Sequence, residues 1–318
     1  QGNGIGLNAT QTVIGPQVTI QADALTHGPG GEVIVWADGD TQFYGSISAQ
    51  GGLNGGDGGF IEVSGKDHLS FGGDIDLSAP QGQAGRLLLD PENIIVVDEN
   101  GTNDAELNDG QILATDGGDR PFTITEETLE TLSGTATITL EATNDVIIQN
   151  LTDDELDLAG GSPIRIVADA DGDGRGTFRM SDRGDEISSD SQDITITGAV
   201  IQPGQINSEG GDITLVASDR IQLLPGSEIH SGQFDGIPDD TEFNDFTQDF
   251  AGEITLTAGN EIQLQGTSIT ANGGGSGSGA AGNIRLTSQA GSIRITQNSE
   301  ILSEVLSQGF AGSIHLNA

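Results

Sequence analysis

The residues best suited to chemistry are three aspartates at alternate positions, followed by a glycine at position 174: Asp169, Asp171 and Asp173. In calcium loops, carboxylates with this spacing converge on one ion, and the glycine permits a sharp turn. The bidentate acid that closes such a loop is expected at position 180, where this chain has Met180, and Asp182 is a substitute further along. Two interpretations stay open: a calcium site, or a hydrated turn whose aspartates pair with nearby arginines.

A second acidic stretch, FDGIPDDTEFND, spans residues 234–245. It is similar to the Asp-Gly-Ile-Pro-Asp element of thrombospondin type-3 calcium repeats, and this likeness makes Asp235 and Asp239 candidate calcium ligands. The aspartates that precede the element in those repeats are absent, with Gln233 and Phe234 in their region. The surrounding insertion, 232–250, contains four of the ten phenylalanines. We expect it to pack on the flank of the fold or to contact a partner.

The sequence does not indicate an enzyme. The four histidines lie far apart and share no motif: His27, His68, His230 and His315. There is no Gly-x-Ser-x-Gly elbow, no His-Glu-x-x-His pair and no phosphate-binding loop. We therefore expect no catalytic residues and no required cofactor, with calcium as the one optional ion.

The elements that position these residues follow from a repeat in the last third of the chain. Similar stretches begin at Gly210, Ala251, Ala281 and Ala311, and each contains Ile-x-Leu or Ile-x-Ile couplets separated by polar turns. Apolar residues at every second position predict short strands with one buried face. Each couplet is too short to bury its apolar face alone, so successive repeats must stack on one another. The prediction is an all-β fold, a parallel β-helix, with right-handed crossovers as the general preference.

We expect one β-solenoid over 1–318, with an acidic excursion at 98–160 and the loop insertion at 232–250. Within the excursion, Thr125 with its following glutamates predicts a capped short helix. The spacing of Thr152 and Glu155 matches a capping box and predicts a second helix.

Charge and composition narrow the possible functions. The formal net charge is −39, which disfavours binding to nucleic acid or anionic lipid. Cysteine is absent, so disulfides and thiolate metal sites are excluded. No apolar run reaches the ~20 residues of a membrane helix, and we expect no membrane insertion. The chain begins at Gln1 and shows no signal peptide, so we expect a processed product or part of a longer protein.

Several segments resemble a known protein class, most specifically EVIVWADG near residue 32 and RLLLDPENI near residue 86. They resemble filamentous-haemagglutinin-like exoproteins of the two-partner secretion class, in versions common in cyanobacteria. The resemblance covers most of the chain. It implies a right-handed parallel β-helix that is secreted from a Gram-negative-type bacterium and serves as adhesin, fibre or scaffold. The export module of that class is not visible in this sequence.

Two functional hypotheses follow. The first is structural: a rod segment of a secreted adhesin, or the subunit of an extracellular filament whose copies stack end to end. The second is a carbohydrate- or cell-surface-binding adhesin module that acts through its two insertions. The expected partners are further copies of the chain or cell-surface glycans.

Overall fold

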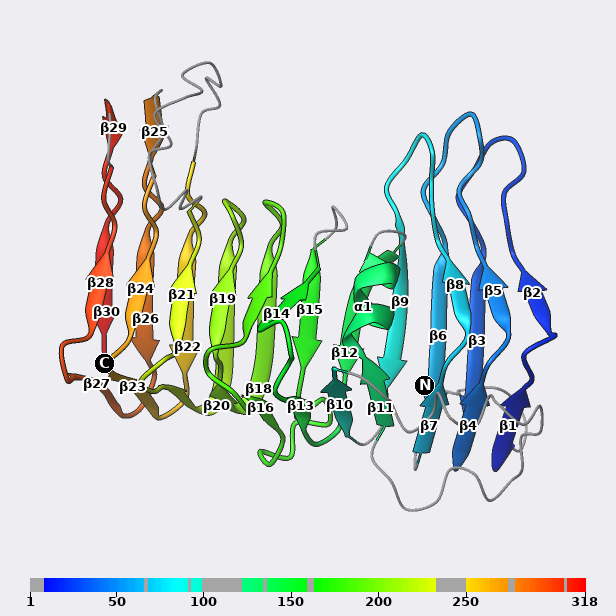
Figure 1. The fold of residues 1–318 in the computed structure, drawn as a ribbon, viewed down its shortest axis with the longest axis horizontal. Coiled ribbons are helices and arrows are strands. Elements are labelled where there is room, and N and C mark those ends of the chain that lie inside the picture. The colour runs from blue at the N-terminus through cyan, green and yellow to red at the C-terminus, as the bar shows by residue number, and fades with distance from the viewer. Residues whose placement is uncertain are drawn as a thin grey trace. The chain divides into compact units, whose positions relative to one another are not determined.

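The computed structural model describes residues 9–65, 68–90, 93–98, 122–133, 136–158, 163–232, 250–273, 278–305 and 308–318. These residues form 30 β-strands and one helix (Figure 1). Strands pair in parallel with strands of the next coil, for example β3 with β6 and β22 with β26. The prediction of an all-β parallel β-helix is therefore confirmed.

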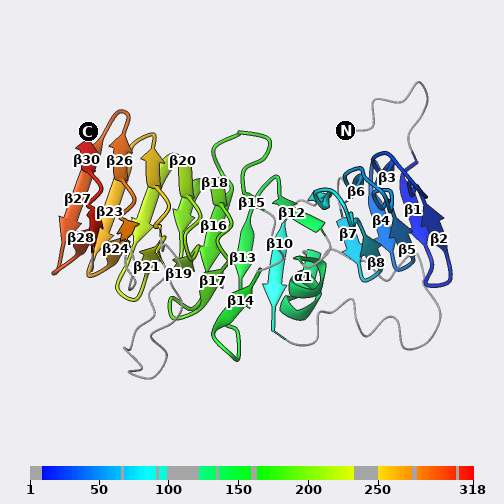
Figure 2. The same cartoon turned by 90° about the horizontal axis from the view of Figure 1, so that it is seen from above.

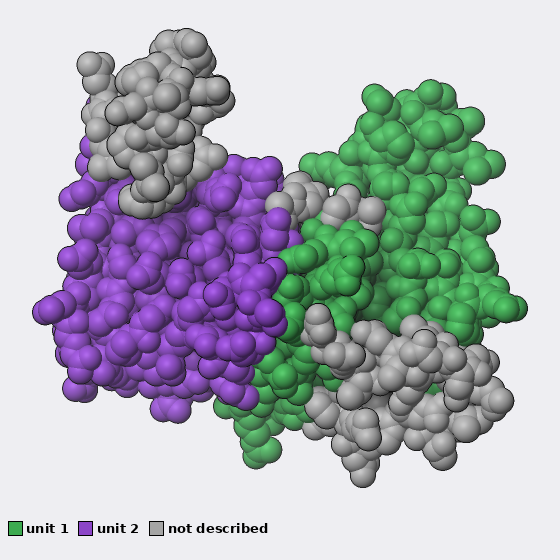
Figure 3. Space-filling model, in the orientation of Figure 1, with its two compact units in different colours: residues 1–149, 165–176 green, residues 150–164, 177–318 purple. Residues whose placement is uncertain are grey.

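The chain divides into two compact units, which Figure 3 distinguishes by colour. Unit 1 comprises Gln1–Gln149 with Arg165–Gly176, and unit 2 comprises Asn150–Ile164 with Thr177–Ala318. One continuous solenoid over 1–318 stays a prediction.

The regular coils of unit 1 contain three strands each, and each strand of a coil belongs to a different parallel sheet. The three sheets have the strand orders β3–β6–β9–β12, β1–β4–β7 and β2–β5–β8. The rings of Phe43 and Phe71 stack at 5.4 Å in equivalent positions of successive coils. Its elements are β1 (Gln11–Ile14), β2 (Thr19–Gln21), β3 (Glu32–Ala37), β4 (Asp40–Phe43), β5 (Ser46–Ser48), β6 (Phe60–Gly65), β7 (His68–Phe71), β8 (Asp74–Asp76), β9 (Gly85–Asp90), β10 (Ile94–Val97), β11 (Phe122–Thr125), α1 (Glu126–Ser133), β12 (Ala136–Glu141), β13 (Val146–Ile148) and most of β15 (Ile164–Val167).

Unit 2 contains the regular repeats, and its strands lie side by side in both ribbon views (Figures 1 and 2). One sheet runs β14–β17–β19–β21–β24–β28, and β18, β20, β22, β26 and β30 pair in succession. Its strands are β14 (Glu155–Asp157), β16 (Thr177–Met180), β17 (Glu186–Ser188), β18 (Ile194–Gln202), β19 (Gln205–Asn207), β20 (Ile213–Leu223), β21 (Glu228–His230), β22 (Ile254–Ala258), β23 (Glu261–Gln265), β24 (Ser268–Thr270), β25 (Ser278–Ala280), β26 (Ile284–Ser288), β27 (Ser292–Thr296), β28 (Glu300–Leu302), β29 (Gln308–Phe310) and β30 (Ile314–Asn317).

Columns of like apolar residues form the core of unit 2. One column is continuous through six coils: Leu156, Ile187, Ile206, Ile229, Ile269 and Ile301. The first five side chains are 0% exposed, whereas Ile301 is partly exposed. Because each side chain packs on its equivalent in the next coil, the last described coil lacks cover on one side.

The glycines that open successive coils are required by close stacking. A Cβ atom at Gly252 would overlap the carbonyl oxygen of Gly211, and one at Gly282 would overlap that of Gly252. The repeat of small residues at these positions therefore reflects backbone contact between coils.

One corner of unit 2 varies in length while its flanking strands stay in register. Here the chain leaves a strand of the β14–β28 sheet and enters the first strand of the next coil. This link has 5 residues between β17 and β18 and between β19 and β20, and 23 between β21 and β22. It has 13 residues between β24 and β26, which include β25, and 11 between β28 and β30, which include β29. Ser231 closes the longest link: its hydroxyl donates to the carbonyl oxygen of Gly252 at 2.7 Å. In the short link after β19, Ser208 donates to Gly211 in the same way at 2.5 Å. The residues that flank the 232–250 insertion, Ser231 and Gly252, are thus hydrogen-bonded to each other.

The two expected helices have different outcomes. The first is confirmed as α1, where the hydroxyl of Thr125 accepts a hydrogen bond from the Thr128 amide at 3.4 Å. The second is wrong: Glu155–Asp157 is strand β14, paired in register with β17. Burial of Leu156 in the apolar column outweighs the local capping signal. The described residues from 122 onward in the predicted excursion include paired strands β11 to β14, and most of 98–121 lies outside the described residues.

Candidate functional site

The loop after β15 brings the three predicted aspartates together. The side chains of Asp169, Asp171 and Asp173 each offer an oxygen, and these oxygens lie within 4.8 Å of one another. The backbone turns sharply here, because Asp169, Gly172 and Gly174 have φ of 62°, 71° and 83°. Such spacing is short enough for three oxygens to contact one calcium ion.

The same carboxylates already accept hydrogen bonds within the loop. Asp169 Oδ1 accepts from the backbone amides of Gly174 at 2.9 Å and Arg175 at 3.4 Å. Asp171 Oδ1 accepts from the amide of Asp173 at 3.2 Å, and Asp173 Oδ2 lies 3.7 Å from Arg175 Nε. These contacts are those of a self-capped polar turn. They favour the turn interpretation and compete with a cation for the same oxygens.

The remaining predicted positions do not converge. Asp235 and Asp239 lie outside the described residues. His27 is in unit 1, His68 begins β7, and His315 is exposed on β30. The imidazole of His230 contacts Thr270 Oγ1 at 2.5 Å through Nδ1 and Glu228 Oε2 at 3.0 Å through Nε2.

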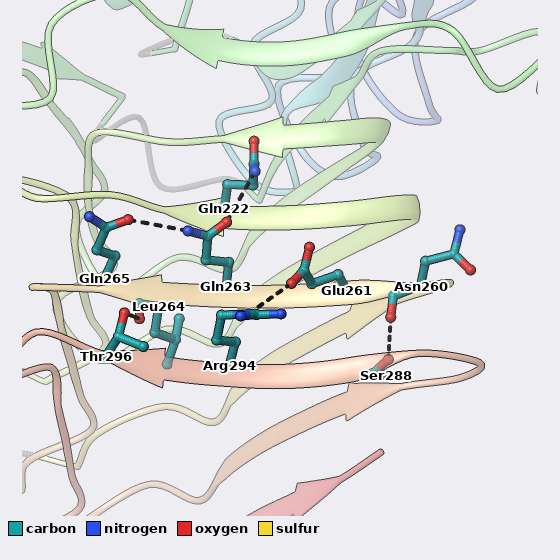
Figure 4. A network of polar contacts seen from close by, with 9 residues as sticks. All are labelled: Gln222, Asn260, Glu261, Gln263, Leu264, Gln265, Ser288, Arg294 and Thr296. Carbon is teal, nitrogen blue, oxygen red and sulfur yellow. Dashed lines mark hydrogen bonds and ion pairs between the residues drawn. The ribbon is translucent and has the colours of Figure 1, made fainter.

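A polar column that the sequence did not reveal crosses one outer face of unit 2, and Figure 4 shows three of its members, Gln222, Gln263 and Arg294. We call it the Gln/Arg column, and its members stand on adjacent strands: Arg179, Gln202, Gln222, Gln263 and Arg294. Gln202 Nε2 donates to Gln222 Oε1 at 2.7 Å, and Gln222 Nε2 donates to Gln263 Oε1 at 3.3 Å. Gln263 Nε2 then donates along its own strand to Gln265 Oε1 at 3.2 Å. The sequence separations of 20 and 41 residues conceal this column until the strand register is known.

Arginines border the amides on both sides. Arg294 Nε lies 3.3 Å from Glu261 Oε1, and Arg220 Nε lies 3.9 Å from Asp219 Oδ2. Both guanidinium groups stay accessible, since their side chains are 64% and 47% exposed. The face therefore offers many hydrogen-bond donors to solvent.

The β14–β28 sheet of the same unit has the opposite character. Its outward residues include Glu155, Glu186 and Glu228. Burial raises the pKa of the Glu186 carboxyl, a hydrogen bond from Asn207 opposes this, and the nearby charge of Glu155 raises it further. Burial, with the charges of Asp190 and Asp157, likewise raises the pKa of Glu209.

At the corner before β17, Asp185 is 0% exposed. Its Oδ2 accepts from the Leu151 amide at 3.2 Å, whereas its Oδ1 has no hydrogen-bond partner among the described residues. Burial raises the pKa of this carboxyl and the Leu151 hydrogen bond lowers it, while neighbouring aspartates add to the rise. Burial and the unpaired Oδ1 thus both disfavour the charged form of this carboxyl.

The sequence matches no protein-family model, and no curated protein matches it. Among the described residues, no helix has the length and apolar character needed to cross a bilayer.

Proposed function

We propose that this chain is a structural segment of a secreted, filamentous-haemagglutinin-like β-solenoid, serving as a rod segment of an adhesin or as an extracellular filament subunit. The observation that carries the proposal is the stacking of in-register coils, in which apolar side chains are covered by the equivalent residues of the coils on both sides. Ile254 and Ile284 are 0% exposed in successive coils, but Ile314, the next member of their column, is 45% exposed. Leu256 and Leu286 are likewise buried, and Leu316 is 51% exposed.

Coil stacking supplies the physical reason. Strand β30 pairs with β26 on one side, and its other edge has no strand partner among the described residues. A further coil with the same couplets would pair that edge and cover Ile314 and Leu316. Fully burying such a side chain contributes ~1.5–3 kcal/mol. In this proposal the partner is the same repeat, in another copy or in a longer chain, at the surface of a Gram-negative-type bacterium.

The first experiment appends a copy of residues 289–318 after Ala318, which continues the 30-residue repeat in phase. We expect the β30 amides to gain hydrogen-exchange protection and the thermal midpoint to rise. A scrambled extension of equal composition is the control. If the in-phase copy protects β30 no better than the scrambled one, the stacking proposal is wrong.

The second experiment separates a filament subunit from a rod segment. Negative-stain electron microscopy of the unmodified chain at increasing concentration is expected to show fibres for a subunit and isolated particles for a rod segment. Ile314→Asp with Leu316→Asp should abolish any fibres. The matched control is Thr255→Asp with Thr257→Asp, which places the same charges on the outward positions of β22 and should leave fibres intact.

The alternative, an adhesin module acting through the two insertions, depends largely on residues outside the described part of the chain.

A further inference from the structure

We propose that β14 is a pH-dependent edge strand, which opens from β17 more often near neutral pH than in mild acid. Both strands belong to unit 2, and such opening requires neither the rod nor the filament function. Three features of the strand pair lead to this behaviour: a single neighbour for β14, two carboxylates that face each other, and a buried carboxylate that joins the two coils.

Strand β14 lies at one end of the β14–β28 sheet, and among the described strands it pairs with β17 alone (Figure 2). The inner strands of this sheet, β17, β19, β21 and β24, each pair with a strand on both sides. An end strand has fewer backbone hydrogen bonds to break, so it can open without the rest of the sheet. Its opening uncovers the pairing edge of β17 and the buried Ile187.

The register sets Glu155 of β14 directly opposite Glu186 of β17. No other pair of adjacent strands among the described strands of this sheet places two carboxylates opposite each other. The hydroxyl of Ser188 donates to Glu155 Oε1 at 2.7 Å, and the side-chain amide of Asn207 donates to Glu186 Oε1 at 3.3 Å. Because these donors are neutral, they cancel neither charge, and like charges directly opposite destabilise a strand pair.

Other charges reach Glu186 from the elements around it. Burial raises the pKa of its carboxyl, and the hydrogen bond from Asn207 opposes this rise. The charged groups that face it are Glu155 on β14, His230 on β21 and Glu209 in the link after β19. The two glutamates raise the pKa of Glu186 and the histidine lowers it, and the net direction is upward. Glu186 therefore takes up a proton above the ordinary carboxyl range, and the repulsion from Glu155 is then lost.

The carboxyl of Asp185 joins the same two coils from inside. It is 0% exposed, and its Oδ2 accepts at 3.2 Å from the amide of Leu151, 34 residues earlier in the chain. Its Oδ1 has no hydrogen-bond partner among the described residues. Three carboxylates face it, Asp182 in its own turn and Asp153 and Asp154 in the turn before β14. Protonation of Asp185 removes a buried charge that half of the group leaves unpaired.

The direction of the pH effect follows from these contacts. While β14 is closed, the pKa values of Asp185 and Glu186 lie above their ordinary values. Opening of β14 separates Glu155 from Glu186 and admits water to Asp185, so both pKa values fall back toward ~4. The closed strand thus binds these protons more tightly than the open one, and closure is favoured as the pH falls from neutral toward the ordinary carboxyl range.

The test is native-state hydrogen exchange of the full chain at pH 7 and pH 5, expressed as protection factors so that the pH dependence of the intrinsic rates is removed. The reporters are the amides of Glu186 and Leu158, which donate across the pair to the carbonyl oxygens of Asp154 at 2.8 Å and Ser188 at 3.0 Å. We expect their protection to be about ten-fold higher at pH 5, since a buried acceptor left unsatisfied costs at least that factor.

The opposite end of the same sheet supplies a matched internal control. Strand β28 also pairs with one described strand, β24, but Ser268 faces Glu300 there and no carboxylate pair exists. Its reporters are the amides of Glu300 and Ala271, which donate to the carbonyl oxygens of Thr267 and Leu302, both at 2.9 Å. Their protection should change much less between the two pH values.

Two variants locate the effect. Asp185→Asn and Glu186→Gln each remove one charge and keep an oxygen for the existing hydrogen bond, so each should raise protection of the β14 reporters at pH 7 and reduce the pH-dependent change. Glu186→Gln, at a partly exposed position, keeps the test decisive if Asp185→Asn does not fold. The control Asp219→Asn removes a carboxylate that pairs with Arg220 elsewhere in unit 2, and it should leave the full change.

Three results would overturn the proposal. They are an equal change in protection at both ends of the sheet, a change that both charge-removing variants leave intact, and a change that Asp219→Asn reduces as much as they do.

Discussion

The column of buried isoleucines in unit 2 gives a quantitative test of coil stacking. Ile229 and Ile301 occupy equivalent positions in β21 and β28, but Ile229 is 0% exposed and Ile301 is partly exposed. Replacing isoleucine by alanine removes about three carbon groups, each worth ~0.8 kcal/mol when buried. At Ile229 a cavity cost adds to this, and the expected loss is about 3–4 kcal/mol within the ~2–5 kcal/mol range for such changes.

At Ile301 the same change removes a side chain with no coil on its far side. Less apolar area is lost and no closed cavity forms, so we expect about 1 kcal/mol. Ile301→Ala is therefore the matched control for Ile229→Ala. Native-state hydrogen exchange is the suitable assay, because it reports the opening free energy of individual coils and does not require two-state unfolding.

The reasoning fails if the two substitutions cost the same in a monomeric sample. Equal costs near 3 kcal/mol would mean that Ile301 is covered in solution, and equal costs near 1 kcal/mol would mean that neighbouring coils do not share a tightly packed core. A cost at Ile301 that grows with protein concentration would identify another copy as the cover and support the filament form of the proposed function.

Three further predictions concern the corners and loops. Replacing residues 232–251 with Glu-Gly, which copies the link at 209–210, should shift the thermal midpoint of unit 2 by less than ~4 °C, equivalent to ~1 kcal/mol in a domain of this size; a collapse of the transition would show that the insertion braces the coil. Lowering the pH from neutral toward the ordinary range of carboxyl pKa values should raise stability. The folded pKa of Asp185 lies above its unfolded value, so the native state binds the proton more tightly and gains stability as the pH falls through the folded pKa. Urea midpoints at pH 7 and pH 5 check this, and Asp185→Asn should reduce the difference. Asp169→Ala should cost about 1–2 kcal/mol, because it removes the acceptor for two loop amides, and thermal melts should show the same cost in calcium and in chelator; a cost confined to calcium would establish the metal site.

The fold was largely readable from the sequence because the apolar couplets recur with a period that only stacked coils explain. The apolar pattern predicted the structure less well where a helix-capping pattern competed with it. Thr152 and Glu155 have helix-capping spacing, but the strand that contains Leu156 pairs with β17. Local capping energies of ~1 kcal/mol are smaller than the burial of a leucine in a continuous column.

The candidate sites were only partly predictable. Three aspartates at alternate positions predict a loop in which their carboxylate oxygens lie close together, and in the structure these oxygens lie within 4.8 Å of one another. Their internal hydrogen bonds could not be foreseen, since these depend on the positive φ at Asp169. The Gln/Arg column was missed because its members come from strands separated by links of unequal length. Only the register, set by the apolar residues on the opposite side of each strand, places Gln222 beside Gln263.

The unequal links at the corner after β17, β19, β21, β24 and β28 have an evolutionary consequence. Since register is enforced on both sides of that corner by neighbouring coils, the number of residues between Ser231 and Gly252 is free to drift without moving a strand. Related chains should therefore differ by gaps and additions at this one position while their couplets keep their phase. Residues inserted at this corner could acquire a new function without disturbing the packed core of the coils.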